Sequence, residues 1–368
     1  MAMRTRAAVV RHPGGDFEYE EVELESPRPD EVLVRMIACG VCHTDIAARD
    51  GLFGLRFPAV LGHEGAGVVE AVGNKVSRVR AGDRVVLSFG SCGHCAGCKK
   101  GHPARCLEFD EINFGGSRVD GSQNIRDSKG RPVTGSFFGQ SSFSYHALAG
   151  ERNLVPVDAA DEDQLAVFAP LGCGVQAGAG TVLNELKPVP GESAAIFGAG
   201  AVGLAALMAA RIAGAGPIVA VDIIPSRLEL ALQLGASVVI DGRKEDVGAK
   251  LRQTIGAVDH AVETTGVPRV VDHAIRSLGP RGKISLLGIP VNDPEDPVSP
   301  MRTGPGQTAV HSIAGDSNPL EFIPFLIRSY LEGRFPVDRL IREYPASKIN
   351  EAVEDSLKGI TIKPVLRF

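Results

Sequence analysis

The first 170 residues or so carry their hydrophobic positions in short runs that turn-forming residues separate. The runs RAAVV, EVLVRMIACG, GAGVVEAVG, GDRVVLSFG and SFSYHALAG are rich in valine and are interrupted by Gly, Asp or Pro. Short apolar runs of this kind, bounded by turn residues, indicate strands. This part of the chain therefore predicts a mostly antiparallel β domain, as a sheet or a barrel.

The hydrophobic pattern changes from about residue 190 onwards. SAAIFG is followed by the helix-like AVGLAALMAARIAG, and then PIVAVDI, SRLELALQLGA and SVVID repeat the change from strand to helix to strand. Strands that alternate with helices over short loops indicate βαβ units and a parallel sheet. The crossovers of such units are right-handed almost without exception.

The last fifty residues or so have a third pattern. Two helical stretches, NPLEFIPFLIRSYLEG and INEAVEDSLKG, precede the apolar strand IKPVLRF. This tail lies beyond the sixth strand of the parallel sheet, so we expect it to return to the first domain. The predicted organisation is 1–174, 175–315 and a returning segment 316–368. The longest irregular region, about 110–136, is polar and rich in glycine, and we expect an exposed excursion there.

Length and charge exclude several classes of protein. The chain has 368 residues, enough for two domains, and a net charge of −5 with both signs interspersed. This balance argues against a nucleic-acid surface and offers no membrane-binding patch. The N-terminus lacks the apolar core of a signal peptide. The apolar stretch SAAIFGAGAVGLAALMAA contains clustered glycines and predicts a buried strand, turn and helix rather than a membrane span. We therefore expect a cytoplasmic protein.

A glycine motif opens the second domain. Gly198, Gly200 and Gly203 have the G-x-G-x-x-G spacing directly after the strand AAIF, and Asp222 ends the next strand. In this context the glycines allow a tight turn, close approach of a pyrophosphate and close helix packing, and the helix N-terminus attracts the phosphates. An acidic residue at this position accepts hydrogen bonds from the adenosine ribose and repels a 2′-phosphate. We predict NAD rather than NADP; the alternative is a structural turn that binds nothing.

Four of the seven cysteines lie in one short segment. Cys92, Cys95 and Cys98 are three apart and Cys106 follows. Disulfides, an iron–sulfur cluster and zinc would all explain such a cluster. Thiols stay reduced in the cytoplasm, which places disulfides last.

A second set of metal-binding residue types is spread along the chain. Cys42 lies in ACGVCHTD, His63 in LGHEGAG and Cys173 in APLGCGVQAG. A single cysteine is usually a buried apolar residue, and a single histidine is more often structural than a ligand. Together they offer two thiolates and an imidazole, a set that suits zinc.

These motifs carry a family resemblance. The set GVCHTD, GHEGAGVVEAVG, CGHCAGCKKGHPARC and GAGAVG resembles, in order and spacing, the zinc-dependent alcohol dehydrogenases of the medium-chain dehydrogenase/reductase superfamily. The resemblance extends over essentially the whole chain. It implies a GroES-like β-rich catalytic domain and a doubly wound Rossmann NAD-binding domain, and it implies reversible oxidation of an alcohol with hydride transfer to NAD.

The resemblance also implies a catalytic zinc site. Cys42, His63 and Cys173 match its ligands and leave one position open for water or alcohol. Glu64 matches a carboxylate that approaches the metal when coordination changes. Asp45 matches the residue that orients the imidazole ligand, and such partners tune metal affinity roughly ten- to a hundredfold.

The same resemblance assigns the cysteine cluster to a structural zinc. Cys92, Cys95, Cys98 and Cys106 resemble the closed Cys₄ lobe of this family. In a bacterial ferredoxin the fourth cysteine follows after three residues and precedes proline. Here seven residues intervene and Leu107 follows, which favours zinc. We therefore expect one catalytic and one structural zinc per chain.

Further residues match the family around substrate and cofactor. Thr44 matches the hydroxyl that accepts the alcohol proton, and His43 matches a basic position near the pyrophosphate. Val202 matches the residue behind the nicotinamide, and Arg227 one near the adenosine ribose. Ala47 stands where many members carry a histidine that completes a proton relay. The proton must then leave by another route, through the cofactor ribose to His43 or through water.

The substrate class follows from a narrower resemblance. NFGGSRVDGS, FFGQSSFSYHALAGERNLVPV, FAPLGCGVQAGAG and GDSNP resemble the aryl-alcohol (benzyl alcohol) dehydrogenase branch and its allylic-alcohol relatives. This implies a primary alcohol beside a ring or double bond. Phe53 is either a pocket wall or a residue of the core or of an interface. The 110–136 segment resembles a loop of dimeric members, so we expect a homodimer, with a tetramer as the alternative.

Two other functions remain open on the sequence. A glutathione-dependent formaldehyde dehydrogenase shares both zinc sites but needs a basic anion pocket, which the sequence does not identify. A non-catalytic NAD-binding protein on the same fold is the other alternative. The three ligands Cys42, His63 and Cys173 argue against it, because a binding module has no need of an open metal site.

Overall fold

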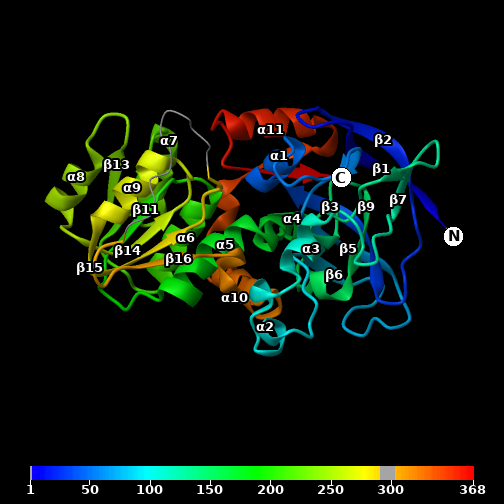
Figure 1. The fold of residues 1–368 in the computed structure, drawn as a ribbon, viewed down its shortest axis with the longest axis horizontal. Coiled ribbons are helices and arrows are strands. Elements are labelled where there is room, and N and C mark those ends of the chain that lie inside the picture. The colour runs from blue at the N-terminus through cyan, green and yellow to red at the C-terminus, as the bar shows by residue number, and fades with distance from the viewer. Residues whose placement is uncertain (1, 291–302) are drawn as a thin grey trace. The chain divides into compact units, whose positions relative to one another are not determined.

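The computed structural model describes residues 2–290 and 303–368, and Figure 1 shows its elements. Contacts within the chain divide it into two compact units. Unit 1 comprises Met1–Cys173, Asn318–Ile327 and Asp338–Phe368, and unit 2 comprises Gly174–Ser317 and Arg328–Val337.

The larger sheet of unit 1 has seven strands. Their order is β10-β6-β5-β3-β18-β17, and β9 pairs with β3 beside this path. The strands are β3 (Glu31–Gly40), β5 (Glu64–Val72), β6 (Arg84–Leu87), β9 (His146–Gly150), β10 (Leu154–Pro156), β17 (Ile341–Pro345) and β18 (Lys363–Arg367). All pairs are antiparallel except β17 with β18. The C-terminal strand β18 thus pairs with β3, more than three hundred residues earlier in the chain.

Alternating apolar residues build the core of this sheet. Val32, Val34 and Met36 point one way from β3 and pack with Val85 and Leu87 of β6. Alternate residues of a strand lie on the same face of the sheet. The face that carries these apolar side chains is therefore the buried one. The antiparallel β domain predicted from the valine-rich runs is confirmed.

A second, five-stranded sheet in unit 1 has the order β4-β1-β2-β7-β8. Its strands are β1 (Met3–Val10), β2 (Phe17–Leu24), β4 (Ala59–Val60), β7 (Ile125–Asp127) and β8 (Pro132–Val133). The helices of unit 1 include α1 (His43–Arg49), α2 (Ala96–Lys99), α3 (Phe109–Phe114), α4 (Glu162–Phe168) and α11 (Ile349–Leu357), and α10 (Pro319–Leu331) runs from unit 1 into unit 2.

The prediction that 110–136 forms an exposed polar excursion is wrong for much of the segment. It contains β7 and β8, and Ile125 and Val133 are buried. Arg118 is also tied down, with its guanidinium 2.6 Å from a Glu31 oxygen and 2.7 Å from a Glu25 oxygen. A charged side chain can be shielded from solvent when its charge is paired, so the polar composition of the segment did not require exposure.

Unit 2 is built on a six-stranded parallel sheet with the order β13-β12-β11-β14-β15-β16. The strands are β11 (Ala194–Phe197), β12 (Ile218–Asp222), β13 (Val238–Asp241), β14 (Val258–Glu263), β15 (Leu278–Leu286) and β16 (Thr308–His311). The helices are α5 (Gly174–Gly180), α6 (Ala201–Ile212), α7 (Pro225–Leu234), α8 (Val247–Thr254) and α9 (Pro268–Ser277), with a π-helical turn at Thr181–Leu186. In this doubly wound order the chain reverses direction across the sheet between β11 and β14, where such folds bind ligands.

Local signals in the sequence mark the ends of these helices. Asp246 caps α8 by accepting a hydrogen bond from the Ala249 backbone N–H at 2.9 Å. Pro225 occupies the first turn of α7, and Gly235 ends that helix with a φ of 117°, which glycine adopts without strain. The parallel α/β fold predicted from the strand–helix alternation is confirmed.

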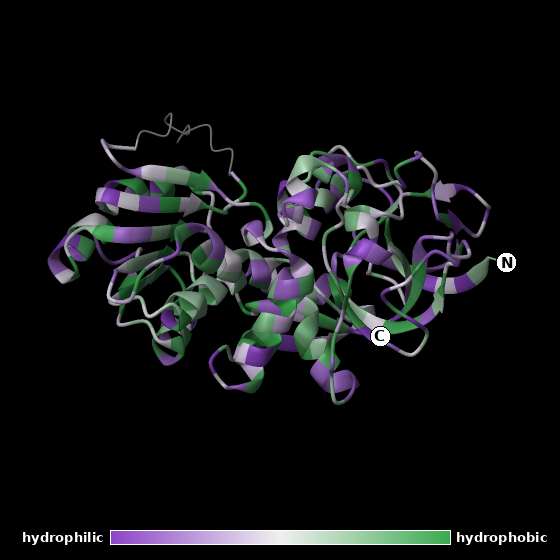
Figure 2. Cartoon of the chain, turned by 90° about the horizontal axis from the view of Figure 1, so that it is seen from below, coloured by the Kyte–Doolittle hydropathy of each residue, from purple (hydrophilic) through white to green (hydrophobic). Residues whose placement is uncertain are grey.

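Hydrophobic and hydrophilic residues alternate along most helices and strands rather than forming long blocks, as the hydropathy colouring in Figure 2 shows. Among the described residues, no single helix is both long and apolar enough to cross a membrane. Only the bent pair Glu162–Gly172 and Gly174–Leu186 passes that test of length and composition together. The apolar stretch at 193–210 is β11 followed by α6, as predicted.

Candidate functional site

The first predicted metal site is organised by a buried carboxylate at the start of α1. Asp45 accepts a hydrogen bond from the Cys42 backbone N–H at 3.0 Å through one oxygen. Its other oxygen accepts from the Gly62 N–H at 3.0 Å and lies 2.8 Å from His63 Nδ1. One side chain therefore joins the loop that carries Cys42 to the loop that carries His63.

The imidazole of His63 is oriented for a metal. It is 0% exposed, and its Nδ1 is engaged by Asp45 while its Nε2 is buried without a hydrogen-bond partner. Burial alone lowers the pKa of His63, but the Asp45 charge outweighs it and raises that pKa to about 10. A metal that binds Nε2 replaces a proton there, so metal binding is coupled to proton release.

Four potential ligands meet at this point of unit 1. Cys42, His63, Glu64 and Cys173 each place one ligand atom within 4.8 Å of the others. The Cys173 thiol donates a hydrogen bond that holds the pKa of Cys42 well below its usual range, and the same interaction raises the pKa of Cys173. Two sulfur atoms, an unpartnered imidazole nitrogen and a nearby carboxylate fit the donor set that zinc prefers.

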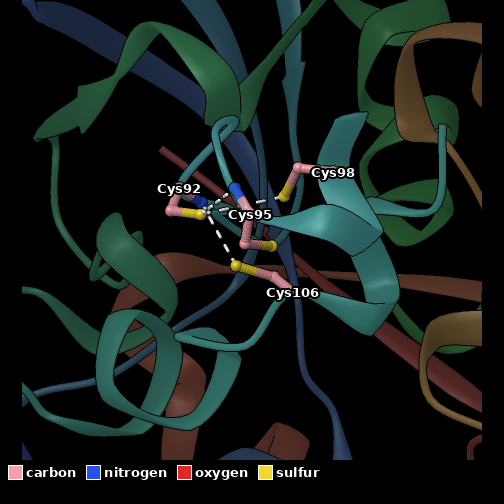
Figure 3. A group of neighbouring side chains, drawn as sticks. All are labelled: Cys92, Cys95, Cys98 and Cys106. Atoms are coloured by element: carbon pink, nitrogen blue, oxygen red, sulfur yellow. Dashed lines mark hydrogen bonds between the residues drawn. The ribbon is translucent and has the colours of Figure 1, made fainter. Parts of the chain in front are cut away.

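The cysteine cluster forms a second candidate metal site. Cys92, Cys95, Cys98 and Cys106 turn their sulfur atoms toward one another around α2, as Figure 3 shows. The sulfur atoms of Cys92 and Cys98 are 4.0 Å apart. Thiolates bound to one tetrahedral zinc at about 2.3 Å are separated by about 3.8 Å.

Backbone groups add to the polarity of this cluster. The N–H of Cys95 donates to the Cys92 sulfur at 3.4 Å, and the N–H of Cys92 donates to the Cys106 sulfur at 3.3 Å. Such donors stabilise thiolates, and backbone hydrogen bonds, first of all from Cys98, lower the pKa of Cys95 to about 6. All seven cysteines of the chain are free of disulfides. The lobe thus fits the closed structural zinc site that the sequence predicts.

The predicted glycine loop lies at the start of α6 in unit 2. Gly198 has a φ of +91°, which favours glycine, and Gly200 is the N-cap residue of α6. A Cβ on Gly203 would lie 1.8 Å from the Gly198 carbonyl oxygen. The loop therefore requires glycine for the turn and for close packing, as a pyrophosphate-binding loop does.

Asp222 lies beside this loop at the end of β12. Its carboxylate accepts hydrogen bonds from the backbone N–H of Ala199 at 2.6 Å and of Ile223 at 2.7 Å. Arg227, on α7, places a guanidinium nitrogen 4.0 Å from an Asp222 oxygen, and its buried Nε has no hydrogen-bond partner. The structure thus brings Asp222 and Arg227 together at the glycine loop. Val202 is half-buried in the first turn of α6.

Sequence profiles and related proteins agree with this geometry. The profile described as "Alcohol dehydrogenase GroES-like domain" matches residues 28–159, and the one described as "Zinc-binding dehydrogenase" matches residues 201–327. A geraniol dehydrogenase from Castellaniella defragrans is 46% identical over 367 residues, which cover 99% of this chain and 97% of the relative. The chain belongs to the zinc-dependent alcohol dehydrogenases of the medium-chain dehydrogenase/reductase superfamily.

Solved alcohol dehydrogenase structures share the whole fold. An alcohol dehydrogenase zinc-binding domain protein from Burkholderia ambifaria is 48% identical with a TM-score of 0.95, and the match covers 100% of both chains. A benzyl alcohol dehydrogenase from Acinetobacter calcoaceticus is 42% identical with a TM-score of 0.93, and the match covers 100% of this chain and 99% of that one. The predictions of family, fold class and enzymatic activity are therefore confirmed.

The other residues that the family resemblance singled out lie around α1 and its loop. The Cys42 thiol lies 3.7 Å from Thr44 Oγ1, while His43 is exposed. Phe53 is half-buried and stacks on Phe114, with ring centroids 4.6 Å apart and planes at 25°. Phe53 is thus part of an aromatic cluster.

In this alcohol dehydrogenase, Glu64 has a buried partner that was not among the predicted site residues. Lys363, on β18, is 3% exposed and donates to both Glu64 oxygens, at 3.0 and 2.9 Å. Glu64 also lies close to Gly40, where a Cβ would be 2.0 Å from a carboxylate oxygen. The available signal was the lysine in the predominantly apolar stretch IKPVLRF, because lysine is almost never fully buried without a partner.

Two more missed residues touch His63. The Phe138 ring stacks on the imidazole, and Gln140 hydrogen-bonds the His63 carbonyl at 3.1 Å. Both lie in the stretch FFGQSS, whose only sequence signal was its place in the branch resemblance.

Proposed function

We propose that this enzyme reversibly oxidises a primary alcohol next to an aromatic ring or a double bond to the aldehyde, with NAD as the hydride acceptor. The observation that carries this proposal is the run of aromatic side chains beside the first metal site. Phe53 stacks on Phe114, Phe114 meets Phe138 edge to face at 5.1 Å, and Phe138 stacks on His63. Flat apolar rings favour aromatic and allylic groups over small aliphatic ones. The geraniol and benzyl alcohol dehydrogenases among the relatives support the same class.

Cys42, His63 and Cys173 are the proposed ligands of a catalytic zinc. A bound zinc supplies a Lewis acid that lowers the pKa of an alcohol hydroxyl. Asp45 holds His63 so that Nε2 keeps its lone pair for the metal. Glu64 offers a fourth ligand atom in the same cluster.

Proton transfer in this proposal begins at Thr44. Its hydroxyl lies on the first turn of α1 beside the Cys42 sulfur, and it accepts the proton of the substrate hydroxyl. Ala47 carries no group that accepts this proton in turn. The exposed His43, or water, would then take up this proton.

The glycine loop and Asp222 are the proposed NAD-binding groups. The N-terminus of α6, a helix of 12 residues, attracts the pyrophosphate at Gly198, Gly200 and Gly203. Asp222 would accept hydrogen bonds from the adenosine ribose and disfavour a 2′-phosphate, and Arg227 would lie near the same ribose. Val202 would pack behind the nicotinamide of bound NAD. NAD supplies the hydride acceptor.

The structural zinc, the domain boundaries, the oligomeric state and the location are proposed from the family resemblance. We propose a structural zinc held by Cys92, Cys95, Cys98 and Cys106, which makes two zinc ions per chain. We further propose a catalytic domain of 1–174 and 316–368, an NAD-binding domain of 175–315, a homodimer and a cytoplasmic location. Metal analysis tests the zinc count, and gel filtration with light scattering tests the dimer.

The test of the reaction follows NADH formation by its near-ultraviolet absorbance in zinc-loaded protein. Benzyl alcohol, geraniol and ethanol are compared with NAD, and benzyl alcohol is repeated with NADP. The proposal expects turnover with the first two alcohols, little with ethanol and a preference for NAD. Ethanol oxidised as efficiently as benzyl alcohol would contradict the substrate class, and equal use of NADP would contradict the role of Asp222.

A further inference from the structure

One face of the His63 imidazole is covered by an aromatic side chain from a distant segment. The rings of Phe138 and His63 have centroids 4.3 Å apart and planes at 24°. Phe137 meets the same imidazole edge-on, at 5.5 Å and 90°. Stacked and edge-to-face pairs are both favourable arrangements of rings, so the two phenylalanines define the plane of the imidazole.

The backbone that presents Phe138 has an uncommon conformation. Phe138 has φ 52° and ψ 29°, Gly139 has φ 63° and Ser141 has φ 49°. Residues other than glycine rarely adopt this left-handed region and need surrounding contacts to hold them there. Such contacts exist, because Asn153 donates to the Phe138 carbonyl at 2.9 Å and the Ser141 hydroxyl donates to the Val60 carbonyl at 2.7 Å.

Gln140, in the same segment, binds the backbone on both sides of Glu64. Its amide nitrogen donates to the carbonyls of His63 and Ser88, at 3.1 Å each. Its amide oxygen accepts from the Gly65 N–H at 3.3 Å and from the Ser142 hydroxyl at 2.6 Å. The side chain is 1% exposed, and both donors and both acceptor positions are used.

We infer that residues 137–142 act as a clamp that positions the metal ligand His63, with Phe138 and Gln140 as its two positioning residues. Asp45 holds one nitrogen of the imidazole, but a single hydrogen bond leaves the ring free to tilt about it. Phe138 blocks that tilt on one face, and Gln140 fixes the main chain from which the side chain projects. Nε2 is thereby aimed at the sulfur atoms of Cys42 and Cys173. The left-handed backbone at Phe138 is retained because it places this ring against the imidazole.

The test compares the same substitution, phenylalanine to leucine, at two neighbouring rings of the aromatic cluster beside His63. Phe138→Leu removes the ring that stacks on His63. Phe114→Leu removes a neighbouring ring that packs on Phe138 and not on the imidazole. The zinc-loaded enzymes are mixed with a coloured chelator, and the release of each zinc is timed. The clamp predicts that Phe138→Leu speeds release from the catalytic site at least about tenfold. Release from the cysteine lobe stays as in the parent, and Phe114→Leu changes neither rate by more than about twofold.

Two further variants separate positioning from folding. Phe138→Gly removes the ring and also the steric cost of the left-handed backbone, so it should fold and still release catalytic zinc fast. Phe138→Tyr keeps the ring and should restore the parent rate. With cobalt in the catalytic site, the visible absorption bands should change in Phe138→Leu and in Gln140→Leu but not in Phe114→Leu.

Equal release rates and unchanged cobalt bands in Phe138→Leu and Phe114→Leu would overturn the clamp. The inference rests on the proposed zinc ligands, and the two failures are distinguishable. A parent enzyme that holds only the zinc of the cysteine lobe would contradict the catalytic site, and with it the clamp. If the parent holds two zinc ions and Phe138→Leu releases the catalytic zinc at the parent's rate, only the clamp would be contradicted.

Discussion

Lys363 Nζ lies 2.9 Å from a Glu64 carboxylate oxygen, and both side chains are buried in unit 1. The ammonium also donates to the Val41 carbonyl at 3.0 Å. Burial lowers the pKa of Lys363, but the Glu64 charge outweighs it and raises that pKa above the usual range. Burial also raises the pKa of Glu64, and Lys363 opposes that rise. The pair ties the C-terminal strand to the residue that follows His63.

Lys363→Met should destabilise the protein through Glu64. The substitution keeps most of the side-chain volume but leaves a buried carboxylate without its partner, which costs about 3–5 kcal/mol of unfolding free energy. Urea unfolding of zinc-loaded protein measures this change. The control is the double variant Lys363→Met with Glu64→Gln, which carries no unpaired charge and should recover most of the loss. A single variant no less stable than the double one would show that the charge pairing is unimportant.

Cys98→Ser should affect the cysteine lobe and leave the rest of the fold intact. Loss of one thiolate opens the closed site, and a lobe held by metal loses its structure without it. We expect about one zinc per chain less, and rapid tryptic cleavage after Lys99, Lys100 or Arg105. Cys39→Ala is the matched control, because Cys39 is buried outside both metal clusters. Equal cleavage of the two variants would contradict a structural zinc.

Phe53→Ala should discriminate between substrates. Its ring stacks on Phe114 at the end of the aromatic run, and a ring–ring contact is worth about 0.5–1.5 kcal/mol. We expect the KM for benzyl alcohol to rise roughly two- to tenfold, since 1.4 kcal/mol is a factor of ten, while the KM for ethanol changes little. Steady-state kinetics with both alcohols give the comparison. Parallel changes for both would place Phe53 in the core rather than in the substrate pocket.

His146 should make the stability of unit 1 depend on pH. Burial, assisted by the charge of Arg35, lowers the pKa of His146 in the folded protein, although Glu70 opposes this. As the pH falls through about 6.5, the unfolded chain takes up the proton more readily, so folding stability decreases.

His146→Gln removes that titration while keeping a polar side chain opposite Thr5, whose hydroxyl lies 2.9 Å from Nδ1. Between pH 7.5 and 5.5, the urea midpoint of the parent should therefore fall more than the midpoint of the variant. These pH values lie roughly one unit either side of the pKa of histidine in the unfolded chain. Parallel curves for the two proteins would exclude His146 as the cause.

The sequence by itself determined several features that depend on residues close together in the chain. The strand-to-helix alternation, the glycine loop at 198–203 and the Cys₄ spacing at 92–106 each lie within one or two local elements, where periodicity and turn chemistry set the structure. The residues Cys42, His63 and Cys173 are dispersed along the chain. Their side-chain types suit zinc, but only the resemblance to a known family assigned them to one catalytic site.

The tertiary structure alone decided the contacts between distant residues. Lys363 and Glu64 are 299 positions apart, and no local pattern in either strand indicates the other. Phe138 reaches His63 through a left-handed backbone that its neighbours hold in place, and propensity alone disfavours that conformation. The Arg118 side chain is largely shielded from solvent, because Glu25 and Glu31 pair with it from another part of the chain. The polarity of its segment therefore led to a wrong prediction of exposure. Burial and pairing are properties of the folded neighbourhood, and a charged or strained residue shows its role only when its partners are in place.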